Sequence, residues 1–596
     1  MKTLRRLSQN RFFSHLRIAS ASALVIAAVV TAASASGFGR LYSVDPTEIA
    51  PTADRTVVNR LIPGGQSPAH VPAAFVPRPT PLSVVATGSE FGTNFSGLNF
   101  RNQRFDADNG NQFSVEPPDQ GLCVGNGYVV EAVNDVLAVY NASTGAQIGG
   151  FESLNQFFTG DHAIVRSNPP VFGTFITDPK CLYDAGRGRF FMSVATIGQD
   201  PSTGAFVPPF TVRIATSKTS TPTTSPSDWY FTTIDVTNDG TNGTPSHPGC
   251  PCLGDQPLLG ADANGVYVTT NEFPFFTGGF NGAQIYALQK SALVAGATPN
   301  IQRIEGAPIA STDYGADGIP YSLQPAISPS ASDFVSGSGG TEYLLGALEF
   351  GRKPFTLDNR IAVWALTSTS SLNSTPAIAV SNVVIQSQVY GLPGSIVQPK
   401  GPTPLADSVK ARENLIDGGD DRMQAAVYAH GRLWGAADTV VKTPNGSSQV
   451  GVTYYVVNPT VSGGSVTSAS VVKQGYLSVN NNSVTRPSLA VTSSGRAVIG
   501  VSLVGPDYYP SAAYATLDDA STDPSDLRLA VQGAKPADGF SGYPAFGGSG
   551  VERWGDYGAA SAVGNDIWIA NEWIQGNVSF PPALANWNTF VSKITP

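Results

Sequence analysis

Short apolar segments separated by turns recur along the chain from residue 119 onward. Each copy starts on a polar residue, continues as an apolar strand, turns at Gly or Asn, and returns as a second apolar strand. Nearly continuous apolar strands around a tight turn predict hairpins that are buried on both faces. The sequence holds seven copies, which begin at Asp119, Asp178, Asp255, Gln324, Asp421, Arg486 and Asp556.

A third strand with alternating apolar residues follows each hairpin, and a fourth strand follows six of the seven. The seventh copy is one strand short, because the chain stops at Pro596. The candidate for the missing strand is the apolar segment at residues 82–86, before the first copy. Propellers commonly close their ring with strands from both parts of the chain, which removes an open sheet edge.

The repeat therefore predicts an all-β fold, a seven-bladed β-propeller over residues 81–596 that is closed by an N-terminal strand. The alternative is a pair of stacked β-sandwiches, but that architecture does not explain seven copies of one pattern. The copies start 59 to 97 residues apart. This spacing exceeds the ~40–50 residues of compact propeller repeats, so we expect long loops between the strands.

The first 35 residues have the pattern of a signal peptide. Five basic residues precede or open an apolar stretch at 18–30, and Ala33-Ser34-Ala35 is a small-residue cleavage signal. We expect a secreted protein, extracellular or periplasmic; Arg5-Arg6 leaves twin-arginine export open as the alternative to ordinary secretion. Residues 36–80 are rich in Pro and Ala and are interpreted as a linker. No later segment is apolar enough for a membrane span.

The charge of the chain excludes one class of partner. Without the five basic residues of the signal peptide, 30 basic and 44 acidic side chains remain, which gives a net charge of −14. Nucleic-acid binding requires a basic surface, so we expect no nucleic-acid partner.

Four cysteines in an exported chain predict disulfides, and the candidates are Cys123, Cys181, Cys250 and Cys252. We do not expect Cys250 to pair with Cys252, because a single proline between them leaves little freedom. The sequence does not choose among the connectivities. Zinc is disfavoured because no C-x-x-C or H-x-x-x-H spacing occurs, and we expect no metal site.

Three phrases carry a resemblance to known proteins: ITDPKCLYDAGRGRFFMSVA (176–195), RPSLAVTSSGRAVIG (486–500) and ERWGDYGAASAVGNDIWIANEW (552–573). In these phrases the chain resembles exported bacterial β-propellers of the broad sialidase-like, BNR-repeat-like kind. The resemblance implies the propeller fold. It does not imply a sialidase mechanism, because the chain lacks the S-x-D-x-G-x-x-W box of sialidase blade turns and their Arg-Ile-Pro segment.

In a propeller, the first strand of each blade lines the central channel, so the starting residues of the seven copies should surround one channel mouth. Two dense clusters, 420–422 and 553–557, combine carboxylates, guanidinium groups and aromatic rings. The predicted ligand-binding residues are Asp421, Arg422, Arg553, Trp554, Asp556, Tyr557 and Glu572. The alternative interpretation is structural: the aspartates bond backbone amides between blades, and Trp554 and Tyr557 fill the core.

The sequence offers little support for catalysis. It contains no G-x-S-x-G elbow and few histidines, so catalytic residues stay unknown. We expect no cofactor, although calcium is considered for the Asp/Asn/Gly-rich loops 106–111 and 235–242, which lack EF-hand spacing. The predicted function is an exported propeller whose polar channel mouth binds a ligand or partner, with a glycan or a cell-surface component as the candidate. The alternative is a glycan-acting hydrolase or lyase that uses carboxylates at the same mouth.

Overall fold

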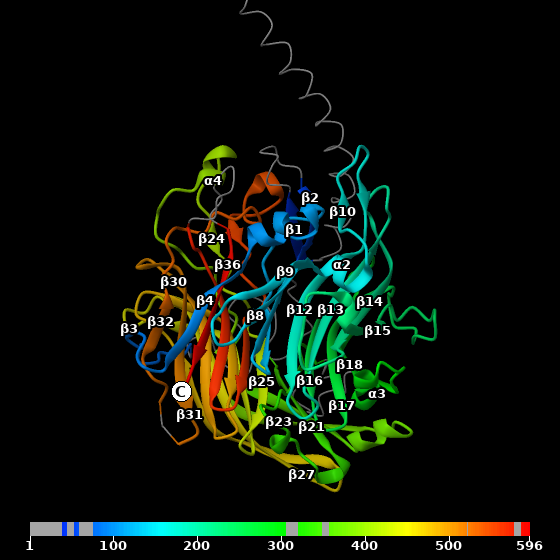
Figure 1. Cartoon of the computed structure of the whole chain (residues 1–596). Helices are drawn as coiled ribbons and strands as arrows, with labels where there is room; N and C mark the ends of the chain where they lie inside the picture. The colour runs from blue at the N-terminus through cyan, green and yellow to red at the C-terminus, as the bar shows by residue number, and fades with distance from the viewer. Residues whose placement is uncertain are drawn as a thin grey trace, which may run out of the picture.

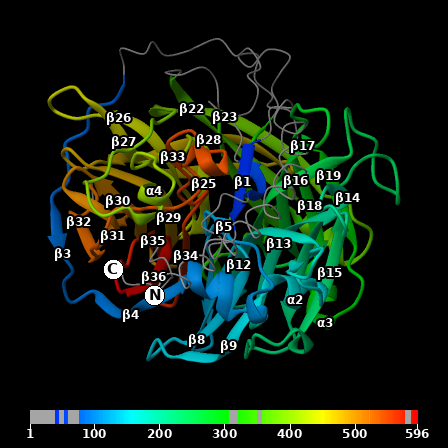
Figure 2. The ribbon, with the colours of Figure 1, turned by 90° about the horizontal axis from the view of Figure 1, so that it is seen from above.

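The computed structural model describes residues 39–44, 53–58, 76–305, 320–348, 357–520, 523–576 and 586–596. The predicted signal peptide lies outside these residues. Within them, the chain forms seven small antiparallel sheets arranged as blades around a central axis (Figure 1), so the predicted seven-bladed β-propeller is confirmed. Seen from above, the chain runs once around the ring from cyan to red (Figure 2). The helices of the described segments are all too short or too polar to cross a membrane.

In every blade the strands lie in order from the axis outward. The first blade contains β6 (Gly121–Gly125), β7 (Tyr128–Val133), β8 (Val136–Asn141) and β9 (Gln147–Ser153). The second contains β12 (Phe175–Asp184), β13 (Arg189–Gln199), β14 (Phe206–Ser217) and β15 (Trp229–Asp235). The third contains β16 (Cys252–Ala261), β17 (Gly265–Pro274), β18 (Gly282–Gln289) and β19 (Ile301–Glu305).

The next three blades follow the same plan. The fourth contains β20 (Gln324–Pro325), β21 (Thr341–Ala347), β22 (Leu357–Thr367) and β23 (Ala379–Gly391). The fifth contains β25 (Met423–Ala429), β26 (Arg432–Lys442), β27 (Ser448–Ser462) and β28 (Ser465–Leu477). The sixth contains β29 (Ser483–Val491), β30 (Arg496–Gly505), β31 (Tyr508–Asp518) and β32 (Leu527–Val531).

The seventh blade is closed by an N-terminal strand, as predicted, but not by the segment at 82–86. Its own strands are β34 (Ala559–Val563), β35 (Asp566–Trp573) and β36 (Asn588–Ile594), and its outer strand is β4 (Phe91–Asn99). The apolar strand β3 (Val84–Ala86) instead adds a parallel fifth strand to the sixth blade. Strand β4 alternates between exposed positions, at Gly92, Asn94 and Ser96, and partly buried ones, so the more continuously apolar segment 82–86 was the stronger candidate from the sequence.

Turn chemistry fixes the hairpins. Between β6 and β7, Asn126 and Gly127 have φ values of 49° and 83°, the left-handed conformation of a type I′ turn. The inner strands also share a feature near the channel mouth, where residues such as Asp119, Asp178 and Gln256 have a positive φ. Register shifts follow at this level in β12, β16, β25 and β29. A bulge bends its strand and changes the direction of the side chains beside it.

The core lies between neighbouring sheets. One cluster, for example, combines Trp434 and Val456 of the fifth blade with Ile499 and Leu503 of the sixth. Outside the blades, short strands occur at β1 (Gly39–Val44), β2 (Ala53–Val58), β5 (Val115–Glu116), β10 (Ile164–Val165), β11 (Val171–Phe172), β24 (Leu415–Ile416) and β33 (Val551–Glu552). Strands β1 and β2, within the segment interpreted as a linker, form a sheet with β5.

Short helices connect or cover the blades. The α-helices are α2 (Leu154–Thr159), α3 (Lys290–Ala295) and α4 (Pro404–Ser408). The other helical turns are η2 (Asn102–Asp106), η3 (Asp108–Gly110), η4 (Pro226–Asp228), η6 (Ala331–Asp333), η7 (Gly337–Gly339), η8 (Thr369–Asn373) and η9 (Pro544–Phe546). Above the fifth to seventh blades, β24 and β33 pair in parallel and join two long insertions over the channel mouth (Figure 1).

All four cysteines form disulfides, as predicted. Cys123 of β6 pairs with Cys181 of β12 and joins the first two blades. Cys250 pairs with Cys252, so the expectation that these two would not pair is wrong. The Cys250–Pro251 peptide bond is cis and the two Cα atoms lie 4.4 Å apart, at the short end of the range that disulfides span.

Candidate functional site at the channel mouth

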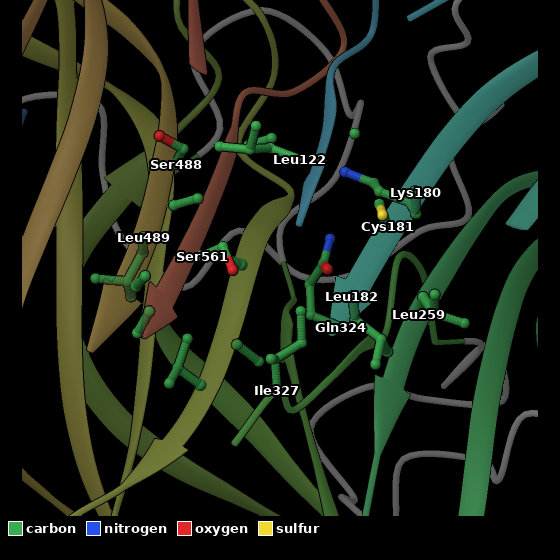
Figure 3. A pocket seen from close by; sticks show the side chains of 18 of the residues that line it. Leu122, Lys180, Cys181, Leu182, Leu259, Gln324, Ile327, Ser488, Leu489 and Ser561 are labelled. Atoms are coloured by element: carbon green, nitrogen blue, oxygen red, sulfur yellow. The ribbon is translucent and has the colours of Figure 1, made fainter. Parts of the chain in front are cut away.

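The central channel is narrow, and both apolar and polar side chains line it. Its walls are the seven inner strands, and side chains such as Leu122, Leu259 and Leu489 point into it (Figure 3). Its volume is about 80 Å³, which is room for a few water molecules and not for a sugar ring. Polar side chains, among them Lys180 and Gln324, gather toward the mouth. A sizeable ligand must therefore bind outside the channel.

The residues that begin the inner strands tie neighbouring blades together. In each case a side-chain oxygen of one blade accepts a hydrogen bond from a backbone N–H at the start of the inner strand of a neighbouring blade. The bonds are Asp178 N to Asn134 Oδ1 (2.9 Å), Gln256 N to Asp178 Oδ2 (3.1 Å), Ser322 N to Asn271 Oδ1 (2.8 Å), Arg486 N to Asp438 Oδ1 (3.0 Å) and Asp556 N to Asp119 Oδ1 (2.6 Å). This is the arrangement that the structural interpretation of the aspartates describes.

A second layer of bonds crosses the channel mouth. Gln256 of the third blade donates Nε2 to Asp556 Oδ2 of the seventh at 3.2 Å. Gln256 Oε1 accepts a hydrogen bond from Arg422 Nη1 of the fifth blade at 2.5 Å. Arg553 donates Nη2 to Asp556 Oδ1, and Asp420 binds the other side of Arg422. The structure thus brings Arg422, Arg553 and Asp556 into one network, with Gln256 as the bridge.

Aromatic rings complete this network. The Lys180 ammonium lies 2.9 Å from the centre of the Tyr557 ring, and the Arg422 guanidinium lies 5.1 Å from that of Tyr321. Tyr557 donates its hydroxyl to Pro179 O at 3.4 Å. The attraction between a cation and an aromatic ring is stronger where water is excluded, so these contacts help to stabilise the buried cations.

The remaining predicted residues are Trp554, Asp421 and Glu572, and all three are buried. Trp554 lies under the insertions, among Ile396, Ile416 and Ile574. Burial raises the pKa of Tyr455 in the fifth blade, and the charge of Asp421 adds to this shift. Burial raises the pKa of Glu572 well above its usual range, although the Gly555 amide opposes the shift.

Burial governs the protonation of the network. It raises the pKa of Asp119 to about 7, with a further contribution from Asp556, and it lowers the pKa of Lys180 to about 7. Burial also acts to raise the pKa of Asp556, but the guanidinium groups of Arg553, Arg422 and Arg486 outweigh this effect, so the pKa of Asp556 is lowered. Asp556 is therefore the ionised centre of the network.

The predicted ligand-binding residues share one property that limits their chemistry. All seven are buried, with Arg553 at 9% the most exposed. General acid–base catalysis needs a carboxyl group within hydrogen-bond reach of the substrate. Among these carboxylates, Asp556 bonds Arg553 and the Gln256 amide, so it joins the seventh blade to the third.

Sequence reasoning missed an exposed apolar surface on the same face, over the second and third blades. We call it the aromatic rim and define it as Phe206, Val207, Phe275 and Phe276. The rings of Phe206 and Phe275 lie 5.6 Å apart and those of Phe275 and Phe276 lie 5.1 Å apart. Phe276 is 53% exposed and Val207 is 36% exposed. The sequence signal was the run FPFF at 273–276, in which two rings follow a strand end.

The comparisons with known proteins bear on the fold alone. No family model and no curated protein matches the chain. Similar solved structures include the phage phi92 endosialidase (8% identity, TM-score 0.37, 87% of this chain and 71% of that one) and the Trypanosoma rangeli sialidase (8%, 0.31, 71% and 55%). A Dyadobacter fermentans protein of unknown function is also similar (10%, 0.31, 70% and 94%). Two of the three are sialidases by name, and all three TM-scores lie below 0.5.

Proposed function

We propose that this protein is an exported binding propeller that holds a glycan on its channel-mouth face, at the aromatic rim, without cleaving it. The observation that carries the proposal is the division of this face into two parts. The carboxylates that could act as acid and base are buried in a closed network, whereas the aromatic rim is open to solvent.

The chemistry of the aromatic rim suits a sugar. The C–H face of a sugar ring packs against an exposed aromatic ring, while nearby polar groups bond its hydroxyls. Thr277, next to Phe276, donates its hydroxyl to Gly249 O, two residues after His247. His247 in turn contacts the exposed carboxylate of Glu305. The small volume of the channel argues against a sugar that enters the ring.

A glycan array followed by a reducing-sugar release assay on the same protein sample tests the proposal. We expect binding without product release, and we expect Phe276→Ala to weaken binding at least about tenfold with an unchanged melting temperature. Phe231→Ala is the matched control, because Phe231 is 38% exposed but packs on Phe157 and Phe158, away from the aromatic rim.

Two results would overturn the proposal. Sugar release that disappears in Asp556→Asn would support the hydrolase instead. Binding that is lost equally in Phe231→Ala and Phe276→Ala would show that the aromatic rim is not the site.

A further inference from the structure

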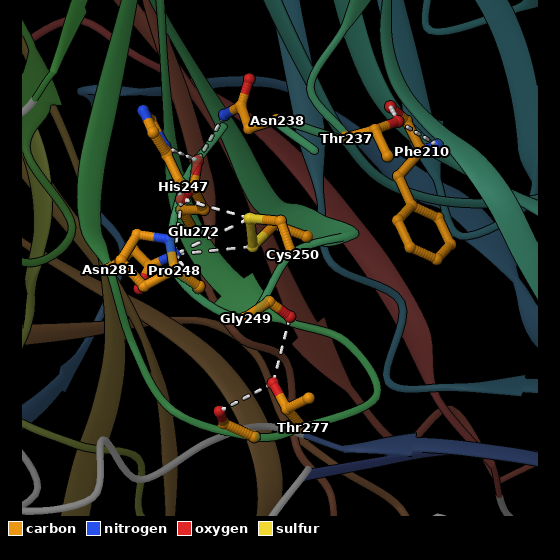
Figure 4. The surroundings of a disulfide bond; sticks show 12 residues. Phe210, Thr237, Asn238, His247, Pro248, Gly249, Cys250, Glu272, Thr277 and Asn281 are labelled. Carbon is orange, nitrogen blue, oxygen red and sulfur yellow. Dashed lines mark hydrogen bonds and ion pairs between the residues drawn. A yellow bond between two sulfur atoms is a disulfide. The ribbon is translucent and has the colours of Figure 1, made fainter. Parts of the chain in front are cut away.

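The Cys250–Cys252 disulfide lies beside a buried carboxylate. In Figure 4 the two sulfur atoms face Glu272 of β17, and ligand atoms of all three residues lie within 4.8 Å of one another. Cys250 Sγ is 3.8 Å from Glu272 Oε1. The disulfide encloses a single residue, Pro251, so it adds little to the constraint that the strands already impose.

The surroundings of Glu272 fix it in place. His247 Nδ1 bonds Oε1 at 2.8 Å, and Asn281 Nδ2 donates to the same oxygen at 2.8 Å. Asn238 Nδ2 donates to Oε2. Only 1% of the Glu272 side chain is exposed, and such a buried carboxylate, held by three neighbours, is the kind of ligand that metal sites use.

The sulfur atoms have a donor of their own. Asn281 Nδ2 lies 3.5 Å from Cys252 Sγ and 3.8 Å from Cys250 Sγ, so one amide faces both sulfur atoms and the carboxylate. An N–H donor beside sulfur stabilises the thiolate, which is the form that leaves during disulfide exchange and that binds metals. Access comes from the loop side, where Pro248 and Gly249 are exposed and Cys250 is half-buried.

We propose that Cys250 and Cys252 form a reducible pair which, once reduced, binds a thiophilic divalent cation such as Zn²⁺ together with the Glu272 carboxylate. Two thiolates and one carboxylate leave a fourth tetrahedral position for water. His247 acts as a positioning residue, because its ring nitrogen holds the Glu272 carboxylate. The proposal is independent of glycan binding.

The chemistry balances with a dithiol as reductant. One thiolate of the dithiol attacks Cys250 Sγ, the S–S bond breaks, and Cys252 leaves as a thiolate that takes up a proton. The second thiol of the reductant then displaces Cys250, which leaves as a thiol, and the reductant departs as a disulfide. Two electrons have moved to the protein, and metal binding afterwards releases the two thiol protons.

Cobalt titration of the full chain tests the proposal. The protein is treated with excess dithiothreitol under anaerobic conditions, desalted, and its free thiols are counted. We expect reduced protein to bind one Co²⁺ with a thiolate-to-cobalt charge-transfer band that Zn²⁺ abolishes, and oxidised protein to show no band. Cys252→Ser should lose the band, and Glu272→Gln should weaken binding at least about tenfold. His247→Ala should weaken it roughly 10–100-fold and keep the band.

The control variant is Cys123→Ser/Cys181→Ser, which removes the buried disulfide between blades and should keep the cobalt band. Three outcomes would overturn the proposal. In the first, the Cys250–Cys252 pair is reduced only when the protein also loses its near-ultraviolet circular dichroism. In the second, two thiols are free but cobalt gives no charge-transfer band. In the third, the band persists in Cys252→Ser.

Discussion

Leu98 donates its backbone amide to the buried carboxylate of Glu131 at 3.0 Å, and this bond joins the strand that closes the ring to the first blade. Thr589 of β36 donates its hydroxyl to Leu98 O at 3.0 Å and also bonds Glu131. One carboxylate thus meets both the last strand of the chain and the N-terminal strand beside it. The seam of the propeller is a specific contact and not only the pairing of two strand edges.

Gly97 tests this seam. A Cβ atom there would lie 2.5 Å from both Glu131 Oε2 and Thr589 Oγ1. We expect Gly97→Ala to lower the free energy of unfolding by about 1–3 kcal/mol through overpacking, measured by urea denaturation. Gly92→Ala, in the same strand, is the control, because a Cβ there meets Lys593 only at ordinary contact distance. Equal stability of the two variants would show that the seam tolerates a side chain.

The ionic network at the channel mouth should contribute to stability through Arg553. Its removal leaves the Asp556 carboxylate buried without its nearest cation, so Arg553→Ala should lose about 3–5 kcal/mol in urea denaturation. Asp556→Asn in the same chain should recover part of that loss. Lys593→Ala breaks the half-exposed pair with Asp566 and should cost less than about 1 kcal/mol. A loss of the same size in the control would contradict a special role for the network.

Asp438 predicts a pH dependence. Burial, opposed by Arg486, raises its pKa to about 8, whereas the unfolded chain has an ordinary value of 3.8. The folded state therefore keeps a proton that the unfolded state releases, and stability falls as the pH rises from about 4 to about 8. Asp438→Asn keeps an acceptor for the Arg486 amide but does not titrate. The free energy of unfolding of Asp438→Asn, relative to that of the parent, should rise by up to about 1.4 kcal/mol per pH unit between pH 5 and 8.

Urea denaturation at several pH values measures this difference. The control is Asp200→Asn: side-chain bonding by Ser202, with further bonds from Thr203, lowers the pKa of the exposed Asp200 to about 2, outside the tested range. A constant difference between Asp438→Asn and the parent across pH 5–8 would contradict the assignment.

The two disulfides should differ in their effect on stability. Cys123 and Cys181 are 58 residues apart and join two blades, so Cys123→Ala/Cys181→Ala should lower the free energy of unfolding by roughly 2–5 kcal/mol. Cys250→Ala/Cys252→Ala removes a disulfide that encloses only Pro251 and should change the free energy of unfolding far less. Chemical denaturation of both variants under oxidising conditions compares them. Equal losses would show that the C-P-C pair constrains the fold as strongly as the blade-to-blade pair.

The fold could be predicted because the same hairpin pattern occurs seven times, and each copy has to bury both faces against its neighbours. The closing strand was missed because an outer strand needs only one apolar face. Strand β4 therefore alternates between exposed and partly buried positions, whereas the more apolar segment 82–86 extends another blade.

The candidate site could be predicted only in part. Charge and spacing placed Arg422 and Asp556 at one mouth, but no pattern marks an uncharged residue such as Gln256 as the bridge between them. The repeat also put Asp255 where the structure has Gln256: Gln256-Pro257 takes the place that Asp178-Pro179 has in the second blade, with the same bulge and a positive φ at its first residue. Burial was hidden for a similar reason: the long insertions that cover the network have no repeat from which to infer their path.

The seam has a consequence for the time course of synthesis. Thr589 and Leu98 are 491 positions apart, so the bond between them forms only after the chain has been made as far as residue 589. Until then β4 has no partner from β36, and the seventh blade presents an open edge of the kind that recruits other chains. Contacts of such separation also make folding slow. A cell that produces this protein must therefore keep a long, incomplete ring from meeting its copies until the last strand arrives.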